Sequence, residues 1–243
     1  MNAFLAVYYR EMLLLWRKFP KHVASLAVSP FLFILAFGYG LGDLEVGGTG
    51  YLSFLVPGLM AMGSMTQAFA MASEINISRF YWKIFEEIQA APVSPLAYVL
   101  GEALAGVSRG LLATAIVLAL ALPFGVQIQV GPALLAAVIL NSFLFACVAV
   151  VSAMLVSSHG DQALITSFVI TPMAFLGGTF FPMDRMPEAV QAVLAFLPLT
   201  HAARIIRAAA LGQPVDPFSF LILAVLGLAA LGLAIWCVRR ATD

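Results

Sequence analysis

The sequence has little charge. Lysine and arginine together number 12, and aspartate and glutamate together number 12, so 10% of the 243 residues are charged, against about 25% in a typical soluble domain. A water-facing surface needs more charge, which excludes an ordinary soluble enzyme. The formal net charge of 0 excludes a nucleic-acid binder, and a hydrophobic share of 63% excludes a disordered chain. With a mean hydropathy of +1.02, the remaining class is an integral membrane protein.

The sequence also lacks the motifs of catalysis. Its two cysteines, Cys147 and Cys237, lie in apolar runs without metal-ligand spacing, so we expect neither a disulfide framework nor a metal site. HExxH and the phosphate loop GxxxxGK[ST] are both absent from the sequence. We therefore expect a non-catalytic chain with no cofactor of its own, which cannot hydrolyse ATP alone.

Six apolar runs approach the length of about 20 residues that a helix needs to cross a bilayer. The first is too long for the apolar core of a signal peptide, and no small-x-small cleavage site follows it, so we expect a retained span. The predicted fold is an all-α integral membrane protein, a single domain over residues 1–243. Its six predicted transmembrane helices are 23–41, 51–73, 103–124, 132–156, 163–181 and 218–238.

Lysine and arginine predict the orientation of these spans. With the N-terminus inside, both termini are cytoplasmic, and the basic residues divide nine inside to three outside. The nine are Arg10, Arg17, Lys18, Lys21, Arg79, Lys83, Arg109, Arg239 and Arg240, and the three are Arg185, Arg204 and Arg207.

Residues 2–19 predict an N-terminal interfacial helix, which Pro20 ends. Arg10, Arg17 and Lys18 belong to its polar side. Two roles remain open, a membrane anchor that sets the angle of the first span and a gating element. The apolar stripe recurs at steps of three or four residues, at Phe4, Tyr8, Met12, Leu15 and Phe19.

Residues 78–90, SRFYWKIFEEIQA, predict a short amphipathic cytoplasmic helix. Prolines of the following AAPVSP end it, and Ser94 can cap the next helix. Such a helix either docks into a groove of another protein or rests on the lipid interface. Its apolar face holds Phe80, Tyr81, Ile84, Phe85 and Ile88, and its polar face holds Arg79, Lys83, Glu86, Glu87 and Gln89.

Residues 183–212 predict an outer re-entrant helical hairpin, because neither of its two short helices is long enough to span. Backbone at membrane depth is tolerated where it packs on protein. His201, Arg204 and Arg207 lie at i, i+3 and i+6 and so share one face. On that face they contact lipid phosphates or an anionic substrate, or they only anchor the helix by snorkelling.

Few polar groups lie inside the predicted spans. Gln67, Asn141, Ser142 and Thr171 are candidates to line a pathway, and hydrogen bonding between helices is an equally open role for Gln67 and Asn141. No charged side chain is expected at mid-bilayer, which disfavours a proton- or sodium-coupled carrier.

Two further local patterns concern the third span. Glu102 and Arg109, two turns apart, predict a local pair at its inner end. Gly106 and Gly110 have the spacing that allows close contact between helices.

These segments together resemble the ABC-2 permease family, the membrane subunit of type-2 ABC exporters, over nearly the whole chain. Tyr39-Gly-Leu-Gly42 and Phe54-Leu-Val-Pro57-Gly58 favour the branch of lipo-oligosaccharide (nodulation) and drug-resistance exporters. The resemblance rests on Glu87-Ile-Gln-Ala-Ala-Pro92-Val-Ser94, Leu176-Gly-Gly-Thr-Phe-Phe-Pro182, Met186-Pro187, and Pro198-Leu-Thr-His201 followed by Arg207.

The resemblance implies an exporter that moves an amphiphilic, lipid-linked or drug-like substrate out of the cytoplasm or inner leaflet, in the bacterial cytoplasmic (inner) membrane. It implies a homodimer in contact with membrane lipid, paired with a separate ABC ATPase (nucleotide-binding) subunit that holds ATP and Mg. An outer gate in contact with lipid headgroups would be formed by Pro198, His201, Arg204 and Arg207. The ATPase-coupling helix would present Arg79, Phe80, Tyr81, Lys83, Ile84, Phe85, Glu86, Glu87 and Ile88.

Two other function classes remain as alternatives. An ATPase-independent secondary carrier or channel would need an ionisable site at the midplane. An intramembrane enzyme or scaffold would need reactive groups near an interface, where only His201, Arg204 and Arg207 cluster.

Overall fold

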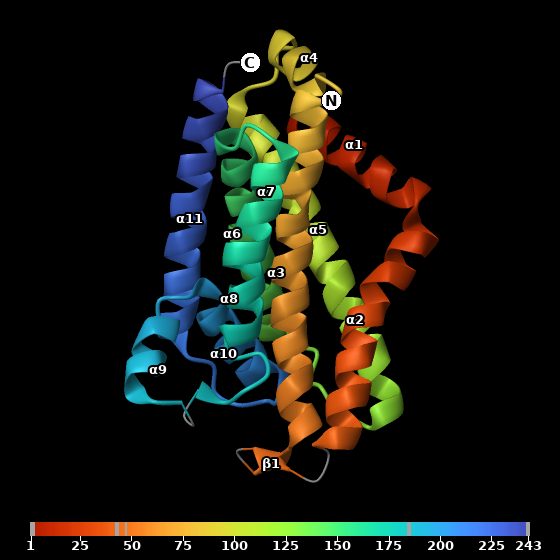
Figure 1. Ribbon diagram of the computed structural model, residues 1–243, viewed down its shortest axis with the longest axis vertical. Helices are drawn as coiled ribbons and strands as arrows, with labels where there is room; N and C mark the ends of the chain where they lie inside the picture. The colour runs from red at the N-terminus through yellow and green to blue at the C-terminus, as the bar shows by residue number, and fades with distance from the viewer. Residues whose placement is uncertain (1–2, 42–43, 47, 184–185, 242–243) are drawn as a thin grey trace.

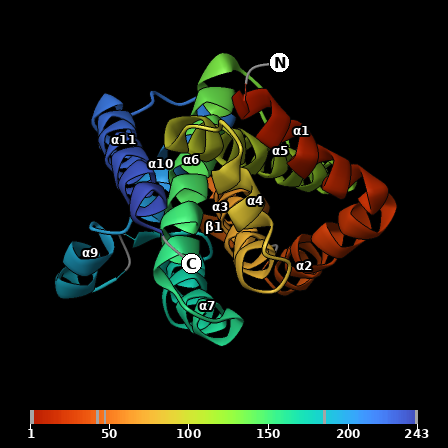
Figure 2. The same ribbon diagram turned by 90° about the horizontal axis from the view of Figure 1, so that it is seen from above.

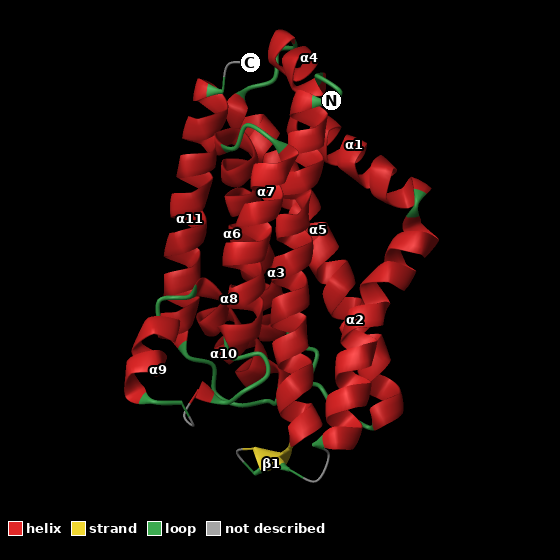
Figure 3. Cartoon of the chain, viewed as in Figure 1, coloured by secondary structure: helices red, strands yellow, loops and turns green. Residues whose placement is uncertain are grey.

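The computed structural model describes residues 3–41, 44–46, 48–183 and 186–241, and within these ranges the chain is a helical bundle with one small hairpin (Figures 1 and 3). Asn2, Gly42 and Arg185, which entered the predictions above, lie outside the described residues. The elements are α1 (Ala3–Arg17), α2 (Phe19–Gly40), β1 (Glu45–Val46), β2 (Thr49–Gly50), α3 (Tyr51–Phe80), α4 (Ile84–Ala90), α5 (Pro95–Ala121), η1 (Leu122–Phe124), α6 (Pro132–Leu155), α7 (His159–Ile165), η2 (Thr166–Ile170), α8 (Thr171–Leu176), α9 (Glu188–Leu194), α10 (Pro198–Ala210) and α11 (Pro217–Arg240).

The bundle has two distinct ends (Figure 1). One, here called the α4 end, carries α4, the beginning of α1 and the last turn of α11. The other, the α10 end, carries α9, α10 and the antiparallel hairpin, in which Glu45 pairs with Gly50 and Val46 with Thr49. Both the first and the last helix therefore reach the same end.

Five helices are long and apolar enough to cross a membrane, namely α2, α3, α5 with η1, α6 and α11. The bent pair α9 and α10 adds a sixth only if it counts as one span, and its two helices meet at 93°. This agrees with the predicted all-α membrane class.

The predicted fifth span, 163–181, is not one regular helix, and its helical pieces begin and end earlier in the chain than predicted. Three consecutive pieces, α7, the π-helical η2 and α8, run from His159 to Leu176 beside α3 and α6 (Figure 1). Residues 177–181 form a turn instead of helix, because Gly178 takes a left-handed conformation with φ of +79°.

The helix expected at 78–90 is also divided. α3 continues through residue 80, well beyond the predicted 73, and α4 begins only at residue 84. Lys83 lies between them with φ of +54°, a left-handed conformation that is uncommon for a residue with a side chain and ends the helical path. After α4, the predicted cap is confirmed, since Ser94 Oγ accepts a hydrogen bond from the backbone N–H of Ala97 at 3.2 Å.

The helix α1 packs on α5; its two most buried side chains lie outside the predicted apolar stripe, whose member Tyr8 also contacts α5 through Ser108. Val7 and Glu11 are its buried side chains, and Val7 fits against Gly101, where a β-carbon would come within 2.7 Å of it. Phe19 already belongs to α2, where Pro20 occupies the first turn, a position that tolerates proline. The side that faces the bundle is thus set by its partner helix rather than by local hydrophobicity.

The helix α3 is the centre of the bundle, with α5, α6, α2 and α10 packed around it (Figure 2). Small residues allow the closest approaches. A β-carbon at Gly106 would overlap Ala146 of α6, and one at Gly110 would overlap Ser142. The close contact predicted from the Gly106–Gly110 spacing is therefore present, between α5 and α6.

A group of five charged side chains, here called the ion cluster, joins α1 to α3 and α5. Arg109 of α5 forms a bidentate salt bridge with Glu74 of α3, in which Nη1 donates to Oε1 at 2.6 Å and Nη2 donates to Oε2 at 2.7 Å. Glu11 of α1 accepts from Arg109 Nη2 at 3.4 Å and from Arg10 Nη2 at 2.6 Å. Glu102 of α5 accepts from Arg10 Nη2 at 3.5 Å.

The ion cluster corrects one prediction. The expected local pair is wrong, because Arg109 and Glu102 each bond to a residue of another helix. Arg109 itself lies near the middle of α5 and is 2% exposed. A buried guanidinium is tolerated there because carboxylates from two other helices pair with it.

The ion cluster yields a stability prediction. We expect Arg109→Gln to lower the free energy of unfolding by about 3 kcal/mol, the low end of the cost of breaking a buried ion pair, because Glu74 is half-exposed. Adding Glu74→Gln should recover part of this loss by removing an unpaired carboxylate. Thermal unfolding of the purified chain in detergent measures both effects.

The matched control is Arg17→Gln, which removes an exposed guanidinium from the last turn of α1. This substitution should change the free energy of unfolding by less than about 0.5 kcal/mol. An equal loss of stability from Arg17→Gln and Arg109→Gln would show that the ion cluster does not hold α1 to the bundle.

Candidate functional site

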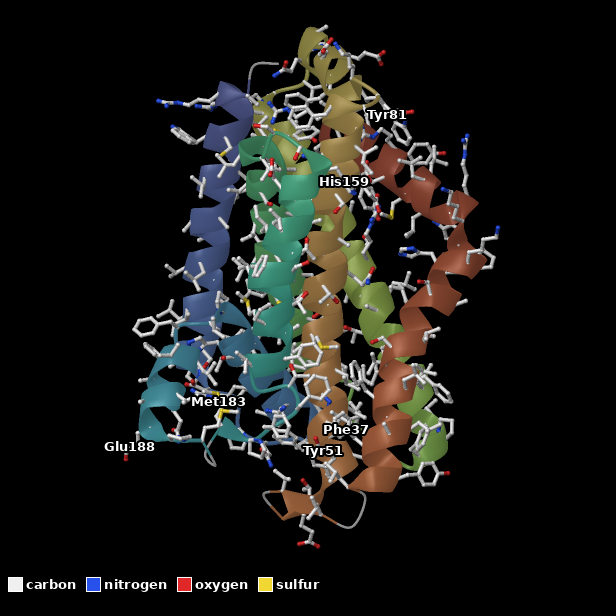
Figure 4. All side chains as sticks on the ribbon, in the orientation of Figure 1. Phe37, Tyr51, Tyr81, His159, Met183 and Glu188 are labelled. Atoms are coloured by element: carbon white, nitrogen blue, oxygen red, sulfur yellow. The ribbon has the colours of Figure 1, made fainter. Side chains whose placement is uncertain are left out.

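The α4 end carries an exposed patch of aromatic and charged side chains. Tyr81 is 80% exposed and points away from the bundle (Figure 4). Lys83 and Glu86 form a salt bridge at 3.5 Å that is open to solvent. We call this patch the α4 surface and define it by its exposed members, Phe80, Tyr81, Trp82, Lys83, Glu86 and Glu87.

The α4 surface differs from the face that helical periodicity predicted. Phe85 is buried, with its ring 5.6 Å from that of Tyr98 in an edge-on contact. Arg79 is buried too and donates from Nη1 to the carbonyl oxygen of Met154 at 2.9 Å. Ile84 and Ile88 are half-buried. These four residues therefore hold α4 against its own chain and do not form an open face.

Trp82 belongs to the α4 surface, and we did not predict it. Trp82 fits neither the four-residue step through Phe80, Ile84 and Ile88 nor the extension of that face through Tyr81 and Phe85. The break at Lys83 exposes it, and a run of three aromatic residues beside a charged stretch is the only sequence signal that points to it.

A cavity of about 400 Å³ opens next to the ion cluster, between α1, α2, α3 and the beginning of α4. Leu14, Leu15 and Ile77 contribute apolar walls, while Lys18 and Glu74 bring charge. Nothing in the sequence indicates this cavity, because its walls come from several separate segments.

The four predicted pathway residues do not lie together. Asn141 is fully buried, and its Nδ2 donates to Ser64 Oγ at 2.9 Å and to the carbonyl oxygen of Ala61 at 3.1 Å. Ser142 donates to the carbonyl oxygen of Val138 within its own helix at 2.7 Å. Asn141 thus joins α6 to α3, which is the helix-bonding role left open for it.

The other two pathway candidates lie at separate places. Gln67 is half-buried on α3, and Thr171 is exposed on α8. The hydroxyl of Thr171 donates to the carbonyl oxygen of Thr166 at 3.0 Å, across the π-helical turn.

The three basic residues of α10 do not share one open face. His201 is buried, with Nδ1 at 3.2 Å from Ser219 Oγ and Nε2 at 3.0 Å from the carbonyl oxygen of Ala195. Arg207 lies half-buried against α3, and only Arg204 is exposed. The expected common headgroup-facing side is therefore wrong for His201, because α10 is wedged among α3, α6 and α11.

A second cavity, of about 500 Å³, lies at the α10 end. Its walls come from α10, from the beginning of α3 and from the turn that follows α8, near Met183 (Figure 4). Arg204, Arg207 and Thr200 line it. Among the described residues, no three His, Cys, Asp or Glu side chains are grouped so that they could hold a metal ion.

Comparison with known proteins gives a match along most of the chain. The ABC-2 type transporter family matches residues 2–211. The inner membrane transport permease YadH of Escherichia coli strain K12 is 30% identical over 167 residues, which are 68% of this chain and 64% of YadH. The chain therefore spans less than two thirds of the length of that relative.

Nodulation proteins match over a larger share. Nodulation protein J of Rhizobium leguminosarum bv. viciae is 31% identical over 222 residues, covering 85% of this chain and 82% of the relative. Nodulation protein J of Bradyrhizobium diazoefficiens is 31% identical over 221 residues, covering 86% of this chain and 81% of the relative. The resemblance drawn from the sequence segments is confirmed, and the chain belongs to the ABC-2 type transporter family.

Proposed function

We propose that this chain is the membrane-spanning permease subunit of an ATP-driven exporter in the bacterial inner membrane. Its family, its long apolar helices and the name of its relative YadH, an inner membrane transport permease, support this proposal. The observation that carries it is the α4 surface, an exposed aromatic and charged patch at the tip of the central helix. ATP and Mg are held by a separate ABC ATPase subunit that docks there.

The anchoring of α4 supports a coupling role. Phe85 of α4 contacts Tyr98 of α5, and Gln89 Nε2 donates to the carbonyl oxygen of Ala241, just after α11, at 2.7 Å. Arg79, near the end of α3, bonds to the end of α6. A displacement of α4 by a partner that closes and opens around ATP therefore acts directly on α5 and on the end of α11, and through α3 on α6.

The α4 end is the cytoplasmic end in this proposal. The last turn of α11 carries Arg239 and Arg240, Arg17 ends α1, and Lys18 follows it. Such an excess of basic residues marks the cytoplasmic side of membrane proteins. Both chain termini are then cytoplasmic.

The substrate class is an amphiphilic, lipid-linked or drug-like molecule. The cavity next to the ion cluster supports this, because its walls combine apolar side chains such as Leu14 and Ile77 with charged Lys18 and Glu74. We place substrate entry there, at the level of the inner leaflet. A homodimer in contact with membrane lipid completes the transporter.

A secondary carrier or channel remains the second candidate, and the ion cluster is the observation that favours it. The cluster holds three carboxylates, those of Glu11, Glu74 and Glu102, against two guanidiniums, and such buried groups can carry protons. Vesicles containing the chain alone separate the two functions. The exporter should leave an imposed pH gradient intact, whereas a proton-coupled carrier or channel should dissipate it.

The α4 surface yields a direct prediction. Tyr81→Ala should weaken association with the partner ABC ATPase by about tenfold or more, because an exposed aromatic side chain at an interface is a frequent hot spot. Copurification of the two chains and a binding titration measure the effect. Phe85→Asp is unsuitable for this test, since Phe85 is buried and its loss would unfold α4.

The matched control is Phe196→Ala, which removes an aromatic side chain that is 87% exposed at the α10 end. It should leave ATPase association unchanged. If both variants bind the ATPase as the unmodified chain does, the α4 surface is not the docking site.

A further inference from the structure

The cavity at the α10 end is lined by charged side chains that have no part in the proposed transport cycle so far. Arg207 lines it and is held in place by two hydrogen bonds, from Nε to the carbonyl oxygen of Phe54 at 3.2 Å and from Nη2 to that of Gly178 at 2.7 Å. Its guanidinium also lies over the ring of Phe54, at 3.8 Å from the centroid. The side chain is therefore oriented before any ligand arrives.

No acid among the described residues neutralises the charge of Arg207. Both of its hydrogen-bond acceptors are backbone carbonyl groups, and within the described ranges no carboxylate forms a salt bridge with it. A largely buried guanidinium without a counter-ion costs free energy that an anion in the cavity would recover.

Arg204 adds a second cation, one turn earlier on α10 and on the wall of the same cavity. Asp216 is the one acid among the described lining residues, and its oxygens cap α11. They accept from Ser219 Oγ at 2.7 Å and from the backbone N–H groups of Phe218 and Ser219. The hydrogen bond from Ser219 contributes most to holding the pKa of Asp216 below its usual range, and the charge of Arg204 contributes least.

A polar group without a partner completes the site. The hydroxyl of Thr200 lines the cavity, the residue is 2% exposed, and its Oγ1 has no hydrogen-bond partner. Buried hydroxyl groups nearly always have one. A ligand oxygen in the cavity would accept from it.

We propose that this cavity binds an oxyanion, such as the phosphate of an anionic amphiphile, between Arg204, Arg207 and Thr200. Guanidinium groups suit this chemistry because their planar array of donors matches the oxygens of a phosphate. The inference rests on the proposed function and names its substrate class, because an oxyanion site at the end opposite α4 is where an exported anionic headgroup would arrive. His201 takes no part, since both of its ring nitrogens already have partners.

Binding to the purified full-length chain tests the proposal. Isothermal titration in a neutral detergent uses three probes, namely dihexanoyl phosphatidylglycerol, its zwitterionic phosphatidylcholine analogue and inorganic phosphate at constant ionic strength. We expect the phosphatidylglycerol to bind and the phosphatidylcholine to bind at least tenfold more weakly. Binding of inorganic phosphate at the same site identifies a free anion as a ligand, and binding of the lipid alone identifies an amphiphile headgroup.

Two substitutions locate the site. Arg204→Gln combined with Thr200→Val should raise the Kd of phosphatidylglycerol by about tenfold or more, since it removes a charged and a neutral donor. Arg207 is left intact, because its bonds to Phe54 and Gly178 also support the fold. The control Arg239→Gln removes an exposed guanidinium at the other end and should leave Kd unchanged.

The proposal is overturned if no anionic probe binds the unmodified chain, if phosphatidylcholine binds as tightly as phosphatidylglycerol, or if the double variant keeps the original Kd. No ATPase is present in this experiment. Its failure would leave docking at the α4 surface untouched, and loss of that docking would leave oxyanion binding untouched.

Discussion

The bidentate salt bridge between Arg109 and Glu74 is the interaction on which the rest of the bundle depends. Charges inside a membrane-spanning helix are stable only when they are paired, and here the partners come from other helices. By also holding Glu11, Arg109 fixes α1 to α5 and so sets where α2 begins. The cavity that we assign to substrate entry lies between these elements because α1 is held at that angle.

The central helix α3 connects the two ends of the proposed transporter. Its last turn leads to the α4 surface, Glu74 anchors it in the ion cluster, and the carbonyl oxygen of Phe54 near its other end holds Arg207. One continuous helix of 30 residues thus touches the ATPase-docking surface, the entry cavity and the oxyanion cavity. A displacement of α4 by an ATPase would therefore act on both cavities through a single rigid element.

The sequence predicted what depends on local composition and missed what depends on distant partners. Apolar run length located α2, α3, α5, α6 and α11, and the Ser94 cap and the close approach at Gly110 followed from short-range rules. The break at Lys83 was missed, since a left-handed lysine carries no sequence signal. The burial of Phe85 and His201 was missed because periodicity places a residue on a face and does not say which neighbouring helix covers that face.

Cysteine crosslinking tests the central claim, that an ABC ATPase docks on the α4 surface, most directly. The two native cysteines, Cys147 and Cys237, are buried, so a cysteine placed at Glu87 is the reactive one. In membranes that contain the chain and its partner ABC ATPase, Glu87→Cys should crosslink to the ATPase, and Phe196→Cys at the α10 end should not. Crosslinking from Phe196→Cys alone, or from neither position, would contradict the account.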